Sequence, residues 1–177
     1  MKQYQFNDVL YMGKKNAIQV ENMAKESVGN IEKSDISGCE KGNVVSFTTH
    51  NGSQIKIGIK KRNIKNLLVA TYIIETEEET YFLKDKPGNS LFYFCVVGNI
   101  DGQDIRIEEN WRSEIEVKID KIHVSTIKAN EFTFKTTIFI EDIINESSLL
   151  FAVIILMYFM YKIYKNESEF IENILFD

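Results

Sequence analysis

The residues best placed by type and spacing to do chemistry form a basic run, KIGIKKRNIKN, in the first half of the chain. Alternation along a strand puts Lys56 and Lys60 on one polar face, and Lys61, Arg62 and Lys65 follow in the adjoining loop. Lysine and arginine side chains gathered on one surface bind phosphate groups and anionic lipid headgroups. The run therefore predicts a headgroup-binding patch made of these five residues. The alternative interpretation is a solvated strand face balanced by the acidic run ETEEET.

A second candidate for chemistry is the pair His123 and Ser125, which would share one face of a regular strand. A serine nucleophile also needs an orienting acid and oxyanion donors, and no phosphate-binding loop, GxSxG, HExxH or zinc spacing occurs in the chain. His50 stands beside an Asn-Gly turn and is expected to face solvent. The sequence thus predicts no catalytic residue, no metal ligand and no cofactor.

Charge and cysteine content narrow the classes of function. The 177-residue chain has a formal net charge of −5 and a pI near 5.2. This acidity argues against nucleic-acid binding, because phosphate neutralisation needs a surplus of Lys and Arg. Cys39 and Cys95 are far apart and show no CxxC spacing, so both are interpreted as reduced packing residues. The first residues contain no apolar leader, so we expect a cytoplasmic protein.

Most of the chain from about residue 16 to residue 141 has the pattern of short strands separated by turns. In QIKIGIKK the isoleucines alternate with polar residues, which is the period of a half-buried strand. The Asn-Gly and Asp-Gly pairs at 51–52 and 101–102 predict tight type I′ hairpins, and Pro-Gly at 87–88 predicts a type II turn. Roughly ten or more strands without intervening helices predict a closed or sandwich-like antiparallel sheet.

An uninterrupted apolar run, LLFAVIILMYFMY, extends from Leu149 to Tyr161. With two flanking serines it would form a helix of about 22 Å, shorter than the ~30 Å hydrocarbon core of a membrane. A helix that is apolar on every side must be covered on every side, and a closed sheet has an inner face to fill. We therefore expect a buried helix capped by Asn145. The alternative is a tail anchor over residues 147–164, with Lys162 reaching the membrane surface.

A strand-rich segment of this size followed by one apolar helix resembles the tubby C-terminal-like superfamily, which includes tubby domains, LURP-one-related proteins and phospholipid scramblases. The resemblance rests on NAIQVENMAKESVGNIEKS as an opening hairpin, YFLKDKPGNSLFYFCVVGNIDGQDIRIEE as middle strands, and FTFKTTIFIEDIINESSLLFAVIILMYFMY as the last strand and helix. The chain looks most like the small bacterial members. The resemblance implies a closed antiparallel barrel of about twelve strands around a central hydrophobic helix. It also implies that binding of anionic lipid is a candidate function.

The central helix is expected to supply the middle of the core. Its predicted core residues are Leu149, Leu150, Val153, Ile154, Leu156, Met157 and Met160. Residues 165–177 are interpreted as an extension after this helix, and a short second helix there would pack over the barrel mouth. Its apolar face would consist of Phe170, Ile171, Ile174 and Leu175. Trp111 is interpreted as another packing residue at the mouth, and the alternative is a role in binding.

These interpretations combine into one functional expectation. Residues 1–177 form a single, mainly β domain that is monomeric and non-enzymatic. The protein is expected to bind anionic lipid headgroups or a protein partner at the inner membrane surface. The alternative function is that of a tail-anchored membrane protein with a cytosolic β-domain.

Overall fold

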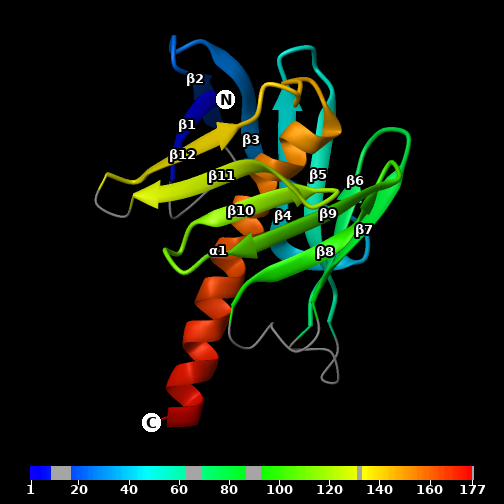
Figure 1. Cartoon of the computed structure of the whole chain (residues 1–177). Coiled ribbons are helices and arrows are strands. Elements are labelled where there is room, and N and C mark those ends of the chain that lie inside the picture. Colours follow the sequence, from blue (N-terminus) through cyan, green and yellow to red (C-terminus); the bar gives the residue numbers. More distant parts are fainter. Residues whose placement is uncertain (9–16, 63–68, 87–92, 131–132, 177) are drawn as a thin grey trace.

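The computed structural model describes residues 1–8, 17–62, 69–86, 93–130 and 133–176, with side chains as far as Phe170. Twelve strands and one helix make up most of these residues (Figure 1). The strands are β1 (Lys2–Asn7), β2 (Ile18–Asn22), β3 (Ser27–Lys33), β4 (Cys39–Thr49), β5 (Gln54–Lys60), β6 (Thr71–Glu75), β7 (Thr80–Asp85), β8 (Cys95–Ile100), β9 (Gln103–Glu109), β10 (Ile115–Ile119), β11 (Ile122–Asn130) and β12 (Lys135–Ile140).

The sheet closes on itself. Strands that are consecutive in the chain pair antiparallel throughout, and β1 pairs with both β2 and β12. The alternation seen in the sequence decides which side chains face inward: Ile55, Ile57 and Ile59 are each at most 5% exposed. The prediction of a mainly β, closed antiparallel barrel of about twelve strands is confirmed.

Two of the three predicted turns lie in the described part of the chain. Asp101 and Gly102 both have positive φ, 52° and 81°, as the predicted type I′ hairpin between β8 and β9 requires. The hairpin between β4 and β5 is also present, but its turn is different. Only Gly52 has positive φ there, and its N–H donates to the Thr49 carbonyl at 3.0 Å. Residues 87–88 lie outside the described residues.

Helix α1 (Leu149–Phe176) runs through the barrel (Figure 1). Every residue from Phe151 to Tyr161 is at most 8% exposed, because the inward faces of the strands surround this apolar part of the helix. Aromatic contacts fix its position, for example an edge-on contact of Tyr4 with Phe151 at 4.9 Å between ring centroids. Of the predicted core residues, Val153, Ile154, Leu156, Met157 and Met160 are at most 1% exposed, and Leu149 and Leu150 are half-buried against the same core.

The two ends of α1 differ from the prediction. Ser148, not Asn145, caps the helix: its Oγ accepts a hydrogen bond from the Phe151 N–H at 3.2 Å, while the Asn145 side chain accepts one from the Ser147 N–H just before the helix. The helix also does not end near residue 164, and no second helix follows. It continues to Phe176, because residues 162–176 contain neither Gly nor Pro to stop it.

Helix α1 is long and apolar enough to cross a membrane by length and composition alone. In this structure the strands already cover its apolar part. The anchor alternative for residues 147–164 would therefore require the helix to leave the barrel and expose the inward faces of the strands to water.

Candidate functional site

The barrel has two distinct ends. We call the end at which α1 begins the start end, and the end at which α1 leaves the barrel the exit end. Figure 1 shows the C-terminal part of α1 extending beyond the strands at the exit end. The connections β5–β6, β9–β10 and β11–β12 lie at the exit end, and the turns β4–β5, β6–β7, β8–β9 and β10–β11 lie at the start end.

The structure separates the residues of the predicted basic patch. Lys56 lies on the barrel wall, where its Nζ is 3.1 Å from the Glu75 carboxylate of the neighbouring strand. Lys60 and Lys61 are exposed where β5 ends, at the exit end, and Arg62 follows them. Lys65 lies outside the described residues. The patch thus retains Lys60 and Lys61 as exposed cations at one end of the barrel.

Arg62 is largely enclosed and holds two carboxylates. Its Nε lies 2.7 Å from Glu40 of the barrel, and its Nη2 lies 2.6 Å from Glu167 of α1. The Arg62 side chain is only 13% exposed. Hydrogen bonds to both carboxylates raise the pKa of Arg62. Burial opposes ionisation of Glu40, but hydrogen bonds from Arg62 and Asn43 outweigh it and lower the Glu40 pKa. Arg62 therefore ties the helix to the barrel.

Two further ion pairs complete a ring of contacts around α1 at the exit end. Lys162 Nζ lies 2.7 Å from Asp8, and Lys165 Nζ lies 3.6 Å from Glu109. The Tyr161 hydroxyl also donates to Glu109 at 2.7 Å. Burial raises the pKa of Tyr161, and the Glu109 carboxylate adds to the effect. We call this ring the collar, formed by Asp8, Arg62 and Glu109 of the barrel with Lys162, Lys165 and Glu167 of α1.

Three aromatic side chains are exposed at the exit end. Trp111 is 86% exposed, Phe134 55% and Phe170 67%. Two expectations were therefore wrong: Trp111 does not pack at the barrel mouth, and Phe170 does not cover it. Trp111 lies in the connection between β9 and β10, and the Arg112 guanidinium lies 4.5 Å from its ring centroid. All three lie at the same end of the barrel, and exposed apolar surface of this kind often marks a binding site.

A cavity of about 630 Å³ opens at the exit end between α1 and the connections β9–β10 and β11–β12. Its charged lining residues are Asp8, Arg112, Lys162, Lys165 and Glu169. Phe134, Tyr158 and Tyr161 supply an apolar side. The cavity combines cations with aromatic rings, although the two lysines already pair with collar carboxylates.

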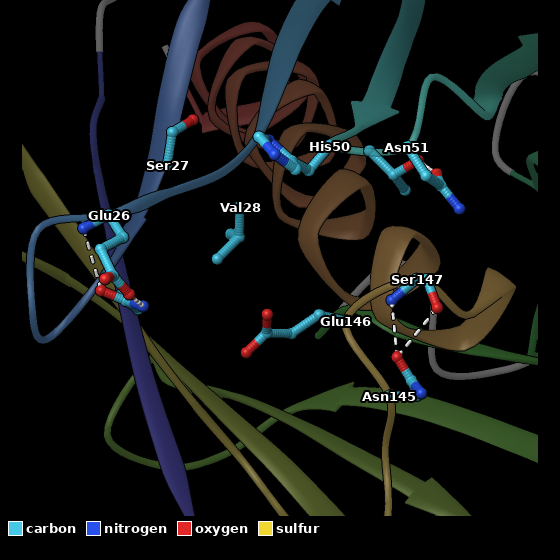
Figure 2. Close-up of a pocket in the computed structure, with 10 residues that line it drawn as sticks. Glu26, Ser27, Val28, His50, Asn51, Asn145, Glu146 and Ser147 are labelled. Atoms are coloured by element: carbon cyan, nitrogen blue, oxygen red, sulfur yellow. Dashed lines mark hydrogen bonds between the residues drawn. The ribbon is translucent and has the colours of Figure 1, made fainter.

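The start end has a contrasting composition. A cavity of about 330 Å³ there is lined by Glu26, His50 and Glu146 among others (Figure 2). Glu146 accepts a hydrogen bond from the Tyr4 hydroxyl at 2.6 Å, and burial together with this carboxylate raises the pKa of Tyr4. His50 is exposed, as expected. Among the described residues that form this lining there is no Lys or Arg, so the lining is acidic, whereas that of the exit cavity is mixed.

The possible His123–Ser125 pair does not form. A bulge in β11 pairs Val117 with Ser125 but Lys118 with His123, so Val124 is an extra residue and the alternation is broken. Ser125 is fully buried, whereas His123 is half-exposed and lies 2.9 Å from the Thr126 hydroxyl. Within the ranges that the structure describes, no group of three or more His, Cys, Asp or Glu side chains is arranged to hold a metal ion.

Sequence reasoning missed the acidic half of the collar and the exposure of the aromatic residues. The collar partners are distant in the chain: 154 residues separate Asp8 from Lys162, and 105 separate Arg62 from Glu167. No local pattern marks such pairs. The available signal was the lack of a helix terminator after residue 164, which would have placed Lys165 and Glu167 on the same helix as the core.

Comparison with known proteins finds no matching family model and no matching curated protein. Among solved structures, the chain is similar to the X-ray structure of a protein from Arabidopsis thaliana. The two share 8% sequence identity over 88% of each chain, with a TM-score of 0.48. A likeness of this size assigns neither a family nor a function to this chain.

Proposed function

We propose that this protein is a non-enzymatic binding module that docks on an anionic membrane surface through its exit end. The observation that carries the proposal is the exposure of Trp111, Phe134 and Phe170 beside cationic side chains at that end. In this proposal the protein acts as a monomer at the inner surface of the membrane, with the rest of the barrel in the cytoplasm.

The aromatic residues would provide the apolar part of the binding energy. Tryptophan is favoured at membrane interfaces, where its ring is partly apolar and its N–H still reaches water. Full burial of one large apolar side chain is worth about 1.5–3 kcal/mol. Insertion of the Trp111 and Phe134 rings would therefore contribute a few kcal/mol without unfolding any part of the barrel.

The cations would provide the electrostatic part. Lys60, Lys61, Arg112 and Lys135 are exposed at the exit end, and each basic residue close to an anionic surface contributes about 1 kcal/mol. The overall charge of −5 does not prevent this. Carboxylates that line the start-end cavities would point away from the lipid, and the exit-end carboxylates Asp8, Glu109 and Glu167 are paired with Lys or Arg in the collar.

A flotation experiment with the full chain tests the proposal. Vesicles of phosphatidylcholine alone and of phosphatidylcholine mixed with phosphatidylglycerol distinguish general apolar binding from binding that needs negative charge. We expect the protein to float with the mixed vesicles and to be released by high salt. Arg62 stays unchanged in all variants, because its loss would loosen the collar.

Two variants locate the surface. A Trp111→Ser, Phe134→Ser variant and a Lys60→Ala, Lys61→Ala variant should each weaken vesicle binding by at least about tenfold. Met23→Ser is the matched control, since Met23 is 65% exposed in the β2–β3 turn at the start end. Absence of binding by the unaltered protein, or equal binding by all variants, would refute the proposal.

A further inference from the structure

The start end contains an apolar cavity that the proposed membrane function leaves unused. The cavity measures about 340 Å³, and Ile119, Val124 and Leu150 belong to its apolar lining. Ile122 and Ile143 line it as well, although they are 65% and 78% exposed. Single exposed isoleucines are common on protein surfaces, but two at one apolar cavity indicate a place where another apolar group binds.

Backbone geometry holds both isoleucines in place. Ile122 follows the Asp120–Lys121 turn between β10 and β11, in which both residues have positive φ, 50° and 70°. Ile143 lies in the connection from β12 to α1, where the Glu141 N–H donates to the Val124 carbonyl at 2.9 Å. The cavity therefore exists before any partner arrives, which lowers the entropic cost of binding.

A second cavity, of about 380 Å³, lies on the other side of the β8–β9 turn. Asp101 of that turn lines the second cavity, whereas Gln103 lines the apolar one. At the start of α1, Leu149 lines the second cavity and Leu150 lines the apolar one. The two cavities are therefore neighbours on one surface.

The second cavity is acidic. Its charged lining residues are Glu77, Glu78, Glu79 and Asp101, and the apolar cavity adds Asp120. In the part of the chain that the structure describes, neither lining includes a lysine or an arginine. The surface thus has an apolar cavity beside a group of carboxylates, and a ligand complementary to both must carry an aliphatic side chain close to positive charges.

We propose that the start end binds a basic polypeptide segment of another protein, with an aliphatic side chain in the apolar cavity and Lys or Arg side chains on the acidic one. A second copy of this chain fits less well. Its C-terminal segment, ESEFIENILFD, is acidic, and a contact between the start end of one copy and the exit end of the next would repeat without closing, producing filaments. The molecule would then link a membrane at one end to a basic partner at the other.

Fluorescence anisotropy with three labelled synthetic peptides tests the proposal on the full chain. The probe KKLKKLKK carries both features, KKSKKSKK lacks the aliphatic groups, and EELEELEE reverses the charge. We expect binding of the first peptide, at least roughly tenfold weaker binding of the second and none of the third. Binding of the first should weaken as salt is raised.

Variants and chemical-shift mapping locate the site. Ile122→Ser with Ile143→Ser should weaken binding of KKLKKLKK roughly tenfold, and Glu78→Gln with Glu79→Gln should weaken it by a similar factor. Met23→Ser again serves as the control, because Met23 lines neither cavity. Peptide-induced amide shifts in a nuclear magnetic resonance spectrum should lie around Gln103, Ile122 and Ile143.

Three results would overturn the proposal. The first is equal binding of KKLKKLKK and KKSKKSKK, which would show charge attraction without a role for the cavity. The second is a set of shifts centred on Trp111 at the exit end. The third is concentration-dependent growth of the unaltered protein into filaments that Ile143→Ser abolishes, which would identify a second copy as the occupant. None of these depends on whether the exit end binds lipid.

Discussion

Helix α1 is continuous from Leu149 to Phe176, yet its two parts have very different surroundings. From Phe151 to Tyr161 every side chain is covered by the barrel, whereas from Lys162 the helix becomes progressively exposed and carries charged collar residues. The inner part is apolar on all sides because strands surround it. The outer part remains helical through favourable residues and the lack of any breaker. The difference shows that backbone conformation and burial are determined separately in this helix.

The largest expected effect lies in the inner part. Leu156→Ala removes a side chain that is fully buried at the centre of the barrel and should lower the free energy of unfolding by about 2–5 kcal/mol. Phe170→Ala in the outer part is the matched control and should change it by less than about 0.5 kcal/mol. Urea denaturation followed by circular dichroism measures both. Similar losses at the two positions would contradict the assignment of Leu156 to the core.

A smaller effect is expected at the junction between the two parts. Arg62→Ala leaves Glu40 and Glu167 facing each other without their cation and should cost about 1–3 kcal/mol in the free energy of unfolding. Lys165→Ala should cost less, because Lys165 is 40% exposed and lies 3.6 Å from its partner.

A double-mutant cycle sharpens this prediction about the collar. If Arg62 stabilises the protein through its contact with Glu167, the Arg62→Ala, Glu167→Gln double variant should lose less free energy of unfolding than the sum of the two single losses. Strict additivity would mean that the Arg62–Glu167 contact does not hold the helix, and that the stability loss arises elsewhere.

The smallest effect on the free energy of unfolding at neutral pH is expected from ionisation of the tyrosines that border the inner part of α1. Tyr4 and Tyr161 have pKa values raised above their ordinary value, chiefly by burial and then by their carboxylate partners. Below about pH 10 both phenols are protonated in the folded and unfolded chains, so they add no pH dependence. Above it the unfolded chain ionises first, and the free energy of unfolding should fall as pH rises.

Denaturation midpoints measured on either side of about pH 10 check this expectation. A Tyr4→Phe, Tyr161→Phe variant should show a weaker alkaline loss and a smaller tyrosinate absorbance on unfolding. Tyr72 and Tyr81, whose pKa values are also raised, supply the signal that remains. An alkaline loss of the same size in this variant would assign the effect to other groups.

Much of the barrel could be predicted from the sequence because the determining signals are local. Alternation in segments such as QIKIGIKK decides the inward face of a strand, and the Asp101–Gly102 pair decides the geometry of its hairpin. The bulge at Val124 was not predicted. Its trace in KIHVSTIK is that Ile127 is out of phase with Ile122 and Val124, and one shifted residue does not show where the extra residue lies. The same limitation produced the wrong expectation that His123 and Ser125 share a face.

The candidate sites could be predicted only in part. The basic run indicated Lys60 and Lys61 at the exit end, but not that Lys56 pairs with Glu75 or that Arg62 is enclosed by two carboxylates. The cavities of the start end had no sequence signal. The linings of the cavities of about 340 and 380 Å³ come mainly from the β4–β5, β6–β7, β8–β9 and β10–β11 turns and from the segment around the start of α1, and these segments meet only because the barrel closes.

The sequence by itself determined which segments are strands and that one apolar segment must be covered on every side, because both follow from the spacing of apolar residues along the chain. Only the tertiary structure decided what covers that segment, which cations stay exposed and which charges pair across the collar. Two of the collar pairs join residues more than a hundred positions apart. Such contacts have no local pattern, because they arise from the closure of the sheet around the helix.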